Sequence, residues 1–98
     1  MAVVSLVSAR VASERREEMR RQFAETVGLG LPAAIRQTFL LEDEDEMAIA
    51  TAWRSREDLD TVRAAPEEPF ARRVLREAGG EPVARFFDVT FEAPTQSP

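Results

Sequence analysis

The feature that most constrains the fold is a pair of apolar segments flanking five consecutive acidic residues. Residues 34–41 alternate partly between apolar and polar side chains, and residues 47–53 alternate cleanly between large and small ones, as β-strands do. The acids between them, Glu42 to Glu46, would repel one another if buried, so they belong in water. The three segments together predict a β-hairpin with an acidic tip.

Strand and helix patterns precede this hairpin. Residues 2–11 are rich in valine and carry apolar side chains at both parities, as a central strand does. Ser13 is expected to cap a helix whose apolar positions, Met19, Phe23 and Val27, are spaced by four. Glycine at positions 28 and 30 is expected to end that helix.

A second helical region and a last strand follow the hairpin. Ser55 is expected to start the region, with Leu59 and Val62 facing inward. Pro66 and Pro69 interrupt it, and Pro69 suits the first position of a further helix that ends at glycines 79 and 80. Residues 83–92 have a strand pattern. Residues 93–98 have no periodicity and are expected to form a flexible tail.

The order strand, helix, strand, strand, helix, strand predicts one α+β domain over residues 1–92. It is the ferredoxin-like βαββαβ arrangement, with a four-stranded antiparallel sheet. We expect the first and third strands at the centre of the sheet, parallel to each other. Right-handed crossovers place both helical regions on one face, which leaves the other face bare.

The bare face predicts a homodimer. Ala48, Ala50 and Ala52 alternate with the large side chains of residues 47–53, and small apolar residues suit close packing of a second sheet. We therefore expect two copies to pair through their sheets, as a dimeric α/β barrel. Parity places Phe86 at this interface. It places the other aromatic residues in the core between sheet and helices: Phe23, Phe39, Trp53, Phe70, Phe87 and Phe91.

Composition excludes several kinds of chemistry. The 98 residues include no histidine, cysteine or tyrosine, and the sequence also lacks lysine and asparagine. Catalysis by a Ser/His or Cys/His pair and a histidine-ligated haem are therefore excluded, and the acidic tip does not match a calcium-binding loop. We expect neither a metal nor a cofactor. A net charge of −5 disfavours nucleic acid and anionic membranes, and no signal peptide or membrane helix is evident, which predicts a cytoplasmic protein.

Four segments together resemble a known family. ATAW at residues 50–53 is followed by RSREDLD, and PFARRVL at 69–75 by PVARFFDV at 82–89. Over about residues 3–91 the sequence resembles the antibiotic biosynthesis monooxygenase-like domains of the dimeric α/β-barrel group. That resemblance implies a role in secondary metabolism, because some members oxidise polycyclic aromatic substrates with oxygen and no cofactor. Other members degrade haem with a histidine and an asparagine, which this chain lacks.

The resemblance also implies where a site would lie. Trp53 would line a cleft between sheet and helices, stack on a planar substrate and donate its N–H to a carbonyl; the alternative is a core anchor. Among the remaining polar groups, Arg36 would stabilise an anion and Asp88 would act as a base if buried beside Phe86. Asp88 pairing with an arginine of the partner sheet is the competing interpretation. The expected substrate-binding residues are Phe23, Phe39, Trp53, Phe70, Arg73 and Phe87.

The polar groups available to such a cleft are few. Apart from Arg36 and Asp88 they are Ser5, Ser8, Thr38, Thr51 and Arg85, with Arg72 or Arg73 on the second helical region. Three functions compete on these grounds. One is a cofactor-independent monooxygenase of an aromatic, polyketide-like molecule. The others are a cyclase or isomerase using the same cleft, and a non-catalytic small-molecule-binding or accessory module.

Overall fold

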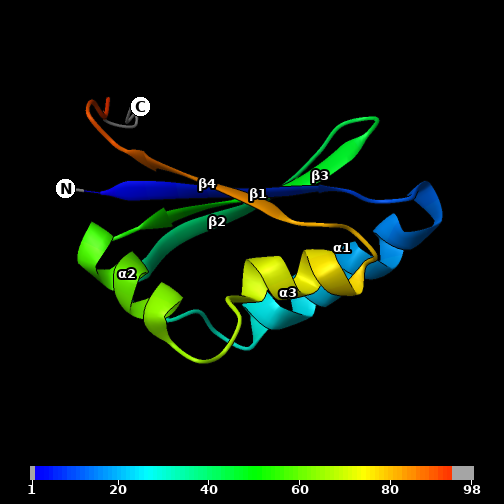
Figure 1. Ribbon diagram of the computed structural model, residues 1–98, viewed down its shortest axis with the longest axis horizontal. Coiled ribbons are helices and arrows are strands. Elements are labelled where there is room, and N and C mark those ends of the chain that lie inside the picture. The colour runs from blue at the N-terminus through cyan, green and yellow to red at the C-terminus, as the bar shows by residue number, and fades with distance from the viewer. Residues whose placement is uncertain (1, 94–98) are drawn as a thin grey trace, which may run out of the picture.

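The computed structural model describes residues 2–93, and its chain forms one sheet with all of its described helices on one side (Figure 1). The strands and helices, in chain order, are β1 (Val3–Arg10), α1 (Ser13–Gly28), β2 (Ile35–Glu42), β3 (Glu46–Trp53), α2 (Arg56–Ala64), α3 (Phe70–Glu77) and β4 (Val83–Asp88). The α+β ferredoxin-like fold predicted from the sequence is confirmed. The tail expected at 93–98 lies outside the described residues, apart from residue 93.

The sheet has the strand order β2-β3-β1-β4, and all neighbouring strands are antiparallel. The prediction that the first and third strands are parallel is therefore wrong. The crossover through α1 skips one strand position, so β1 and β2 run in the same direction with β3 between them. As the hairpin partner of β2, β3 must run opposite to β1.

The helix ends follow local chemistry, with two small departures from the sequence prediction. Ser55 caps α2 as expected, because its Oγ accepts a hydrogen bond from the Asp58 N–H at 3.1 Å. Ser13 does not cap α1: it is the first helical residue, and Ala12 occupies the cap position. Pro69 likewise precedes α3 at its cap position, and the helix begins at Phe70.

The core lies between the sheet and the helices in two clusters. One cluster packs Met19 of α1 and Leu75 of α3 against Met47 and Ile49 of β3. The other is formed by four buried residues: Val3, Ile35, Trp53 and Leu59. Phe70, at the start of α3, is partly buried and packs against both clusters. The space between the clusters, beside Phe70, is where the candidate site lies.

Phe86 and Phe87 face opposite to the prediction. Phe86 is opposite Ser5 of β1, whose side chain is buried under the helices, and it packs against the cluster around Trp53. Phe87 is opposite Val4 on the outer face and is 44% exposed. Two adjacent phenylalanines leave the parity of a strand ambiguous, and pairing with β1 settles it.

Two other phenylalanines, Phe39 and Phe91, also lie elsewhere than the sequence predicted. Phe39 of β2 pairs with Ala50 of β3, so it lies on the outer face and is 46% exposed. Phe91 follows β4, which ends at Asp88, and it is exposed. The sequence analysis placed both residues in the core, and that prediction is wrong for both. A register shift between Ile35 and Gln37 places Phe39 on the outer face, because such an irregularity changes the face of every residue that follows it in the strand.

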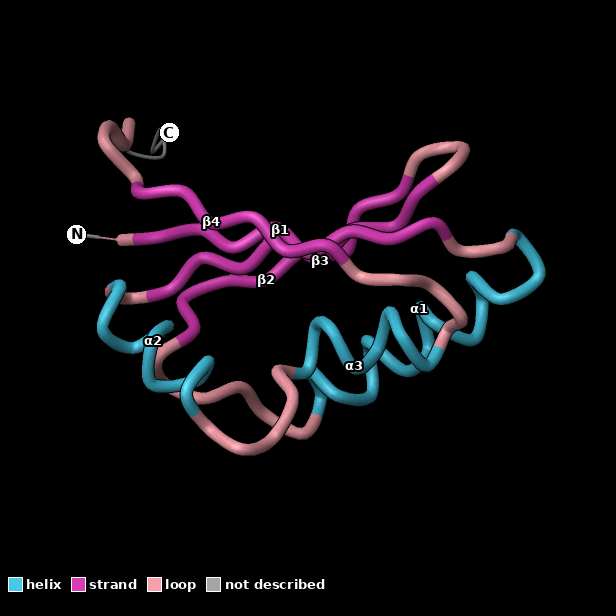
Figure 2. The backbone as a smooth tube through the Cα atoms, viewed as in Figure 1, coloured by secondary structure: helices cyan, strands magenta, loops and turns pink. Residues whose placement is uncertain are grey.

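None of the described helices lies on the outer face of the sheet, as Figure 2 shows. Large apolar side chains are exposed on this face: Phe39 and Leu41 of β2, and Val83 and Phe87 of β4. The alanines of β3 lie between them and are partly buried. Among the described helices, none is both long enough and apolar enough to cross a membrane.

Candidate functional site

A cavity of about 320 Å³ lies between the sheet, α2 and α3. All four strands contribute to its sheet side, and its walls are formed by α2, α3, the loops beside them and the last turn of α1. The side chains that give it its character are Ser5, Thr51, Trp53, Leu59, Val62, Arg63, Phe70, Arg72, Arg73 and Phe86. A mostly apolar cavity of this size with a few polar groups is typical of a small-molecule site.

The two prolines of the second helical region make this cavity possible. Helix α2 ends at Ala64, and Ala65 is extended (φ −65°, ψ 147°), as a residue before proline prefers to be. A loop containing Pro66 and Pro69 then separates α2 from α3. One continuous helix would cover the sheet here, whereas two short helices leave a gap over Trp53.

Trp53 is at the end of β3, 5% exposed, with its ring in the wall of the cavity. Its indole Nε1–H donates a hydrogen bond to Ser5 Oγ at 2.8 Å. Ser5 is also buried and also lines the cavity. Because the indole N–H is bound, the Ser5 hydroxyl is the group beside the ring whose own proton can be donated to a ligand.

The other hydroxyls on the sheet side are paired with each other. Thr51 Oγ1 lies 3.1 Å from Thr38 Oγ1, and Thr51 is almost completely buried. No buried side-chain nitrogen or oxygen among the described residues lacks a hydrogen-bond partner. The buried polar side chains on the sheet side of the cavity therefore already have partners within the protein.

Charged residues line the helical side. The Arg63 guanidinium lies 4.3 Å from the centre of the Phe86 ring, a cation–π contact. Arg73 pairs with Glu77 at 3.8 Å, and Arg76 binds Glu68 at 2.6 Å. The hydrogen bond from Arg76 lowers the pKa of Glu68 below its ordinary value, which makes this carboxylate a poor proton acceptor.

The cavity brings together three of the expected site residues. Trp53, Phe70 and Arg73 line it. Phe23 lies behind Phe70, with 6.3 Å between the ring centres, and does not line the cavity. The remaining expected aromatic residues are on the outer face, as described above.

Arg36 and Asp88, expected to act on the substrate, do not line this cavity. The Arg36 side chain is about half exposed and lies 3.9 Å from Glu92. Asp88 is bound by Arg56 of α2 at 2.6 Å and is also more than half exposed. The burial that a base at Asp88 requires is absent, and the arginine that it pairs with here belongs to its own chain.

Two residues of the cavity escaped the sequence analysis. Phe86 was assigned to the wrong face of β4. Arg63 was overlooked, although it follows Leu59 by four residues and therefore lies beside the inward face of α2. That spacing is the signal that would have found it. Within the described part of the chain, no three acidic side chains gather in a way that could hold a metal ion.

Solved structures share this fold over nearly the whole chain. One is the structure of a mutant of SnoaB, an oxygenase from Streptomyces nogalater that is described as cofactor-independent. Its TM-score is 0.69 and its sequence identity 13%, and the match covers 96% of this chain and 98% of that one. A Deinococcus radiodurans protein assigned to the antibiotic biosynthesis monooxygenases has a TM-score of 0.72 and 13% identity, covering 97% and 99%.

A third similar structure has a different described activity. The haem-degrading protein MhuD from Mycobacterium tuberculosis, with two haems bound in its active site, has a TM-score of 0.68 and 16% identity, covering 94% of this chain and 99% of that one. No protein-family model matches the sequence, and no curated protein matches it. At these identities the similarity establishes the fold. The chain has the fold of the antibiotic biosynthesis monooxygenase-like domain.

Proposed function

We propose that the cavity beside Trp53 binds a planar aromatic, polyketide-like molecule, and that the protein oxidises this molecule with oxygen without a metal or flavin. The observation that carries the proposal is the indole of Trp53, which is fixed by Ser5 and lines an otherwise mostly apolar cavity. An indole held in this way offers a flat surface on which a ring can stack. The similarity to SnoaB supports oxygen as the co-substrate.

The chemistry needs a substrate that supplies the electrons. A ring CH₂ conjugated with a carbonyl through the aromatic rings between them, as in an anthrone, loses a proton to water and becomes an enolate. The enolate transfers one electron to O₂, and the resulting superoxide combines with the substrate radical to form a hydroperoxide after protonation. Loss of water then leaves a new carbonyl. Overall, CH₂ and O₂ become C=O and H₂O, so four electrons pass from the carbon to the oxygen.

The residues of the cavity support this reaction through binding and electrostatics. Trp53 and Phe70 hold the ring in an apolar space, and the Ser5 hydroxyl is placed to donate to the enolate oxygen. A fixed donor is worth more in such a space than in water, because it need not reorganise as charge develops. The chain contains no histidine, cysteine or tyrosine, Asp88 does not line the cavity and Glu68 is bound by Arg76, so the proposal assigns the proton to water.

Oxygen uptake tests the proposal. Purified, metal-free protein is given anthrone or 1,4-naphthohydroquinone in an oxygen electrode, beside Trp53→Phe and the control Phe91→Leu, which changes an exposed aromatic residue. We expect uptake above the autoxidation rate, lowered about tenfold by Trp53→Phe and unchanged by the control. Uptake that does not exceed autoxidation, or that is the same in all three proteins, would contradict the proposal.

The scarcity of acid and base groups in the cavity favours one competing function, a non-catalytic binding module. The same panel separates the alternatives when it is repeated without oxygen. Conversion of substrate under nitrogen would indicate a cyclase or isomerase, whereas binding without conversion in either gas would indicate a binding module.

We also propose that a second copy of the chain covers the outer face of the sheet. Four large apolar residues are exposed there, at Phe39, Leu41, Val83 and Phe87. They flank the partly buried alanines of β3 and the side chains of Val4 and Leu6 of β1. The surface is mostly apolar, and Arg85 of β4 lies on it, 5.0 Å from the centre of the Phe87 ring. Such a surface suits face-to-face packing of two sheets.

A further inference from the structure

We infer that the ligand of this cavity is an aromatic carboxylate, and that its acidic group is bound by Arg72 and Arg63. The inference rests on the proposed function of the cavity as the site of a planar aromatic molecule, and it adds the charge of that molecule. It follows from how the arginines around the cavity are paired.

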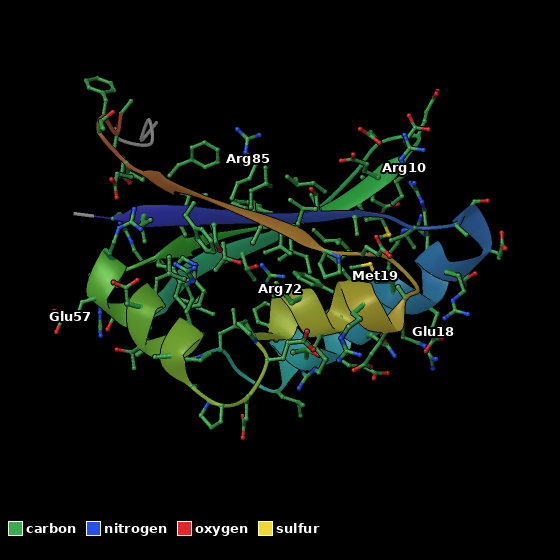
Figure 3. The ribbon with its side chains drawn as sticks, viewed as in Figure 1. Arg10, Glu18, Met19, Glu57, Arg72 and Arg85 are labelled. Atoms are coloured by element: carbon green, nitrogen blue, oxygen red, sulfur yellow. The ribbon has the colours of Figure 1, made fainter. Side chains whose placement is uncertain are left out.

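Helix α3 carries three arginines, and two of them have carboxylate partners. Arg73 is paired with Glu77 at 3.8 Å and Arg76 with Glu68 at 2.6 Å. Arg72 lines the cavity, is partly buried and forms no ion pair with any described residue. Figure 3 shows its side chain on the side of α3 that faces the sheet. Removing a guanidinium from water is costly unless an anion compensates for it.

Arg63 approaches the same cavity from α2. Its guanidinium lies 4.3 Å from the centre of the Phe86 ring, and it forms no ion pair within the described part of the chain. Stacking on a ring fixes the plane of the guanidinium and leaves its N–H groups free at the edge. Arg63 is an exposed residue, so it is held at the rim of the cavity without being neutralised.

Carboxylates at the cavity do not cancel these charges. Two acids contribute to the wall, Glu67 and Glu68, both in the loop before α3. Glu68 is already bound by Arg76, and the charge of Arg72 acts on it only from beyond ion-pair distance. Glu67 is exposed to solvent. Two arginines without ion pairs therefore face one exposed carboxylate. A planar arginine fork matches the two oxygens of a carboxylate, and the pair is stronger beside apolar walls than in water.

The test compares two ligands of the same shape. The affinities of 2-naphthoate and its uncharged analogue 2-naphthamide are measured by isothermal titration calorimetry. The proteins are the wild type, Arg72→Gln, Arg72→Lys and the control Arg21→Gln. Arg21 pairs with Glu18 on the exposed side of α1, so its replacement changes the net charge equally but away from the cavity.

We expect wild type and Arg21→Gln to prefer naphthoate by about tenfold, as one charge-assisted contact would give. Arg72→Gln should lower that preference several-fold, to the part that Arg63 alone supplies, and leave the affinity for naphthamide unchanged; Arg72→Lys should retain more of it. Equal affinities for the two ligands in the wild type would overturn the carboxylate inference while the proposed aromatic site stands. Absence of binding by both ligands would overturn the proposed site as well.

Discussion

At the scale of single residues, the orientation of Trp53 depends on Ser5. Clean alternation along residues 47–53 is sufficient to predict that Trp53 faces inward, and the structure confirms this orientation. The hydrogen bond to Ser5 could not be predicted, because it depends on the register between β1 and β3, which places Ser5 opposite Thr51. A serine two residues into a valine-rich strand gives no signal of its partner.

Replacement of Ser5 by alanine is expected to destabilise the protein. The buried indole N–H would lose its acceptor, at a cost of about 1–3 kcal/mol. Urea unfolding followed by circular dichroism measures this cost. The control is the same replacement in a Trp53→Phe background, where no N–H remains to be satisfied and the cost should be clearly smaller. An equal cost in both backgrounds would show that the hydrogen bond does not contribute to stability.

At the scale of elements, the type and order of every strand and helix were predictable. The direction of neighbouring strands and the face on which their side chains lie were less predictable. The prolines at 66 and 69 correctly predicted an interruption in the second helical region, because proline cannot continue a helix. The predicted facing of β4 was wrong because it depends on the register with β1, a segment far away in the sequence. The predicted direction of β1 relative to β3 was also wrong, although it follows from the crossover through α1 and the hairpin of β2 and β3.

The acidic hairpin tip shows the same dependence on distant contacts. Its acids are exposed, as their mutual repulsion predicted. No sequence pattern indicated that Arg16 of α1 donates hydrogen bonds to the carbonyl oxygens of Asp43 and Glu44. Nor did any pattern indicate that Arg20 binds the Glu42 carboxylate, with 2.6 Å between Nε and Oε2. These contacts join the hairpin to α1.

Glu42 is expected to make stability depend on pH. The hydrogen bond from Arg20 lowers the pKa of Glu42 in the folded state below its ordinary value of 4.5. Its stabilising effect is therefore fully present above the pKa of the unfolded chain and is lost as pH falls through the lowered value. The melting temperature of Glu42→Gln should be below that of the wild type at pH 7, and the difference should vanish in strong acid.

Glu44→Gln is the matched control, because Glu44 lies in the same tip and its side chain forms no ion pair with described residues. Its melting temperature should equal or exceed that of the wild type at pH 7, since the change removes only repulsion. If Glu42→Gln behaves in the same way as Glu44→Gln across the pH range, the pair with Arg20 has no effect on stability.

At the scale of the whole molecule, the outer face of the sheet exposes large apolar side chains, and no described helix covers it. The element order and right-handed crossovers were enough to predict a bare face, and the structure adds four exposed apolar side chains on it. The position of Phe39 and Phe87 on this face was not predicted, because it follows from an irregularity in β2 and from the register of β4.

A charged residue on this face should prevent association. We expect the wild type to be a dimer at micromolar concentration in light scattering and Phe87→Glu to be a monomer, because a carboxylate would be buried between the sheets without a partner. The control Leu29→Glu introduces the same charge at a 90% exposed apolar residue at the end of α1 and should leave the dimer intact. A monodisperse wild-type monomer would refute the proposed pairing.

The most direct test of the central claim uses the fact that Trp53 is the only tryptophan of the chain. Its indole N–H therefore gives a single resonance in ¹⁵N–¹H NMR spectra, and this N–H is bonded to Ser5 in the wall of the cavity. Titration with 2-naphthoate should shift that resonance in a saturable way, together with the amides of Phe70 and Arg72. If it stays in place while amides elsewhere shift, the cavity beside Trp53 is not the binding site.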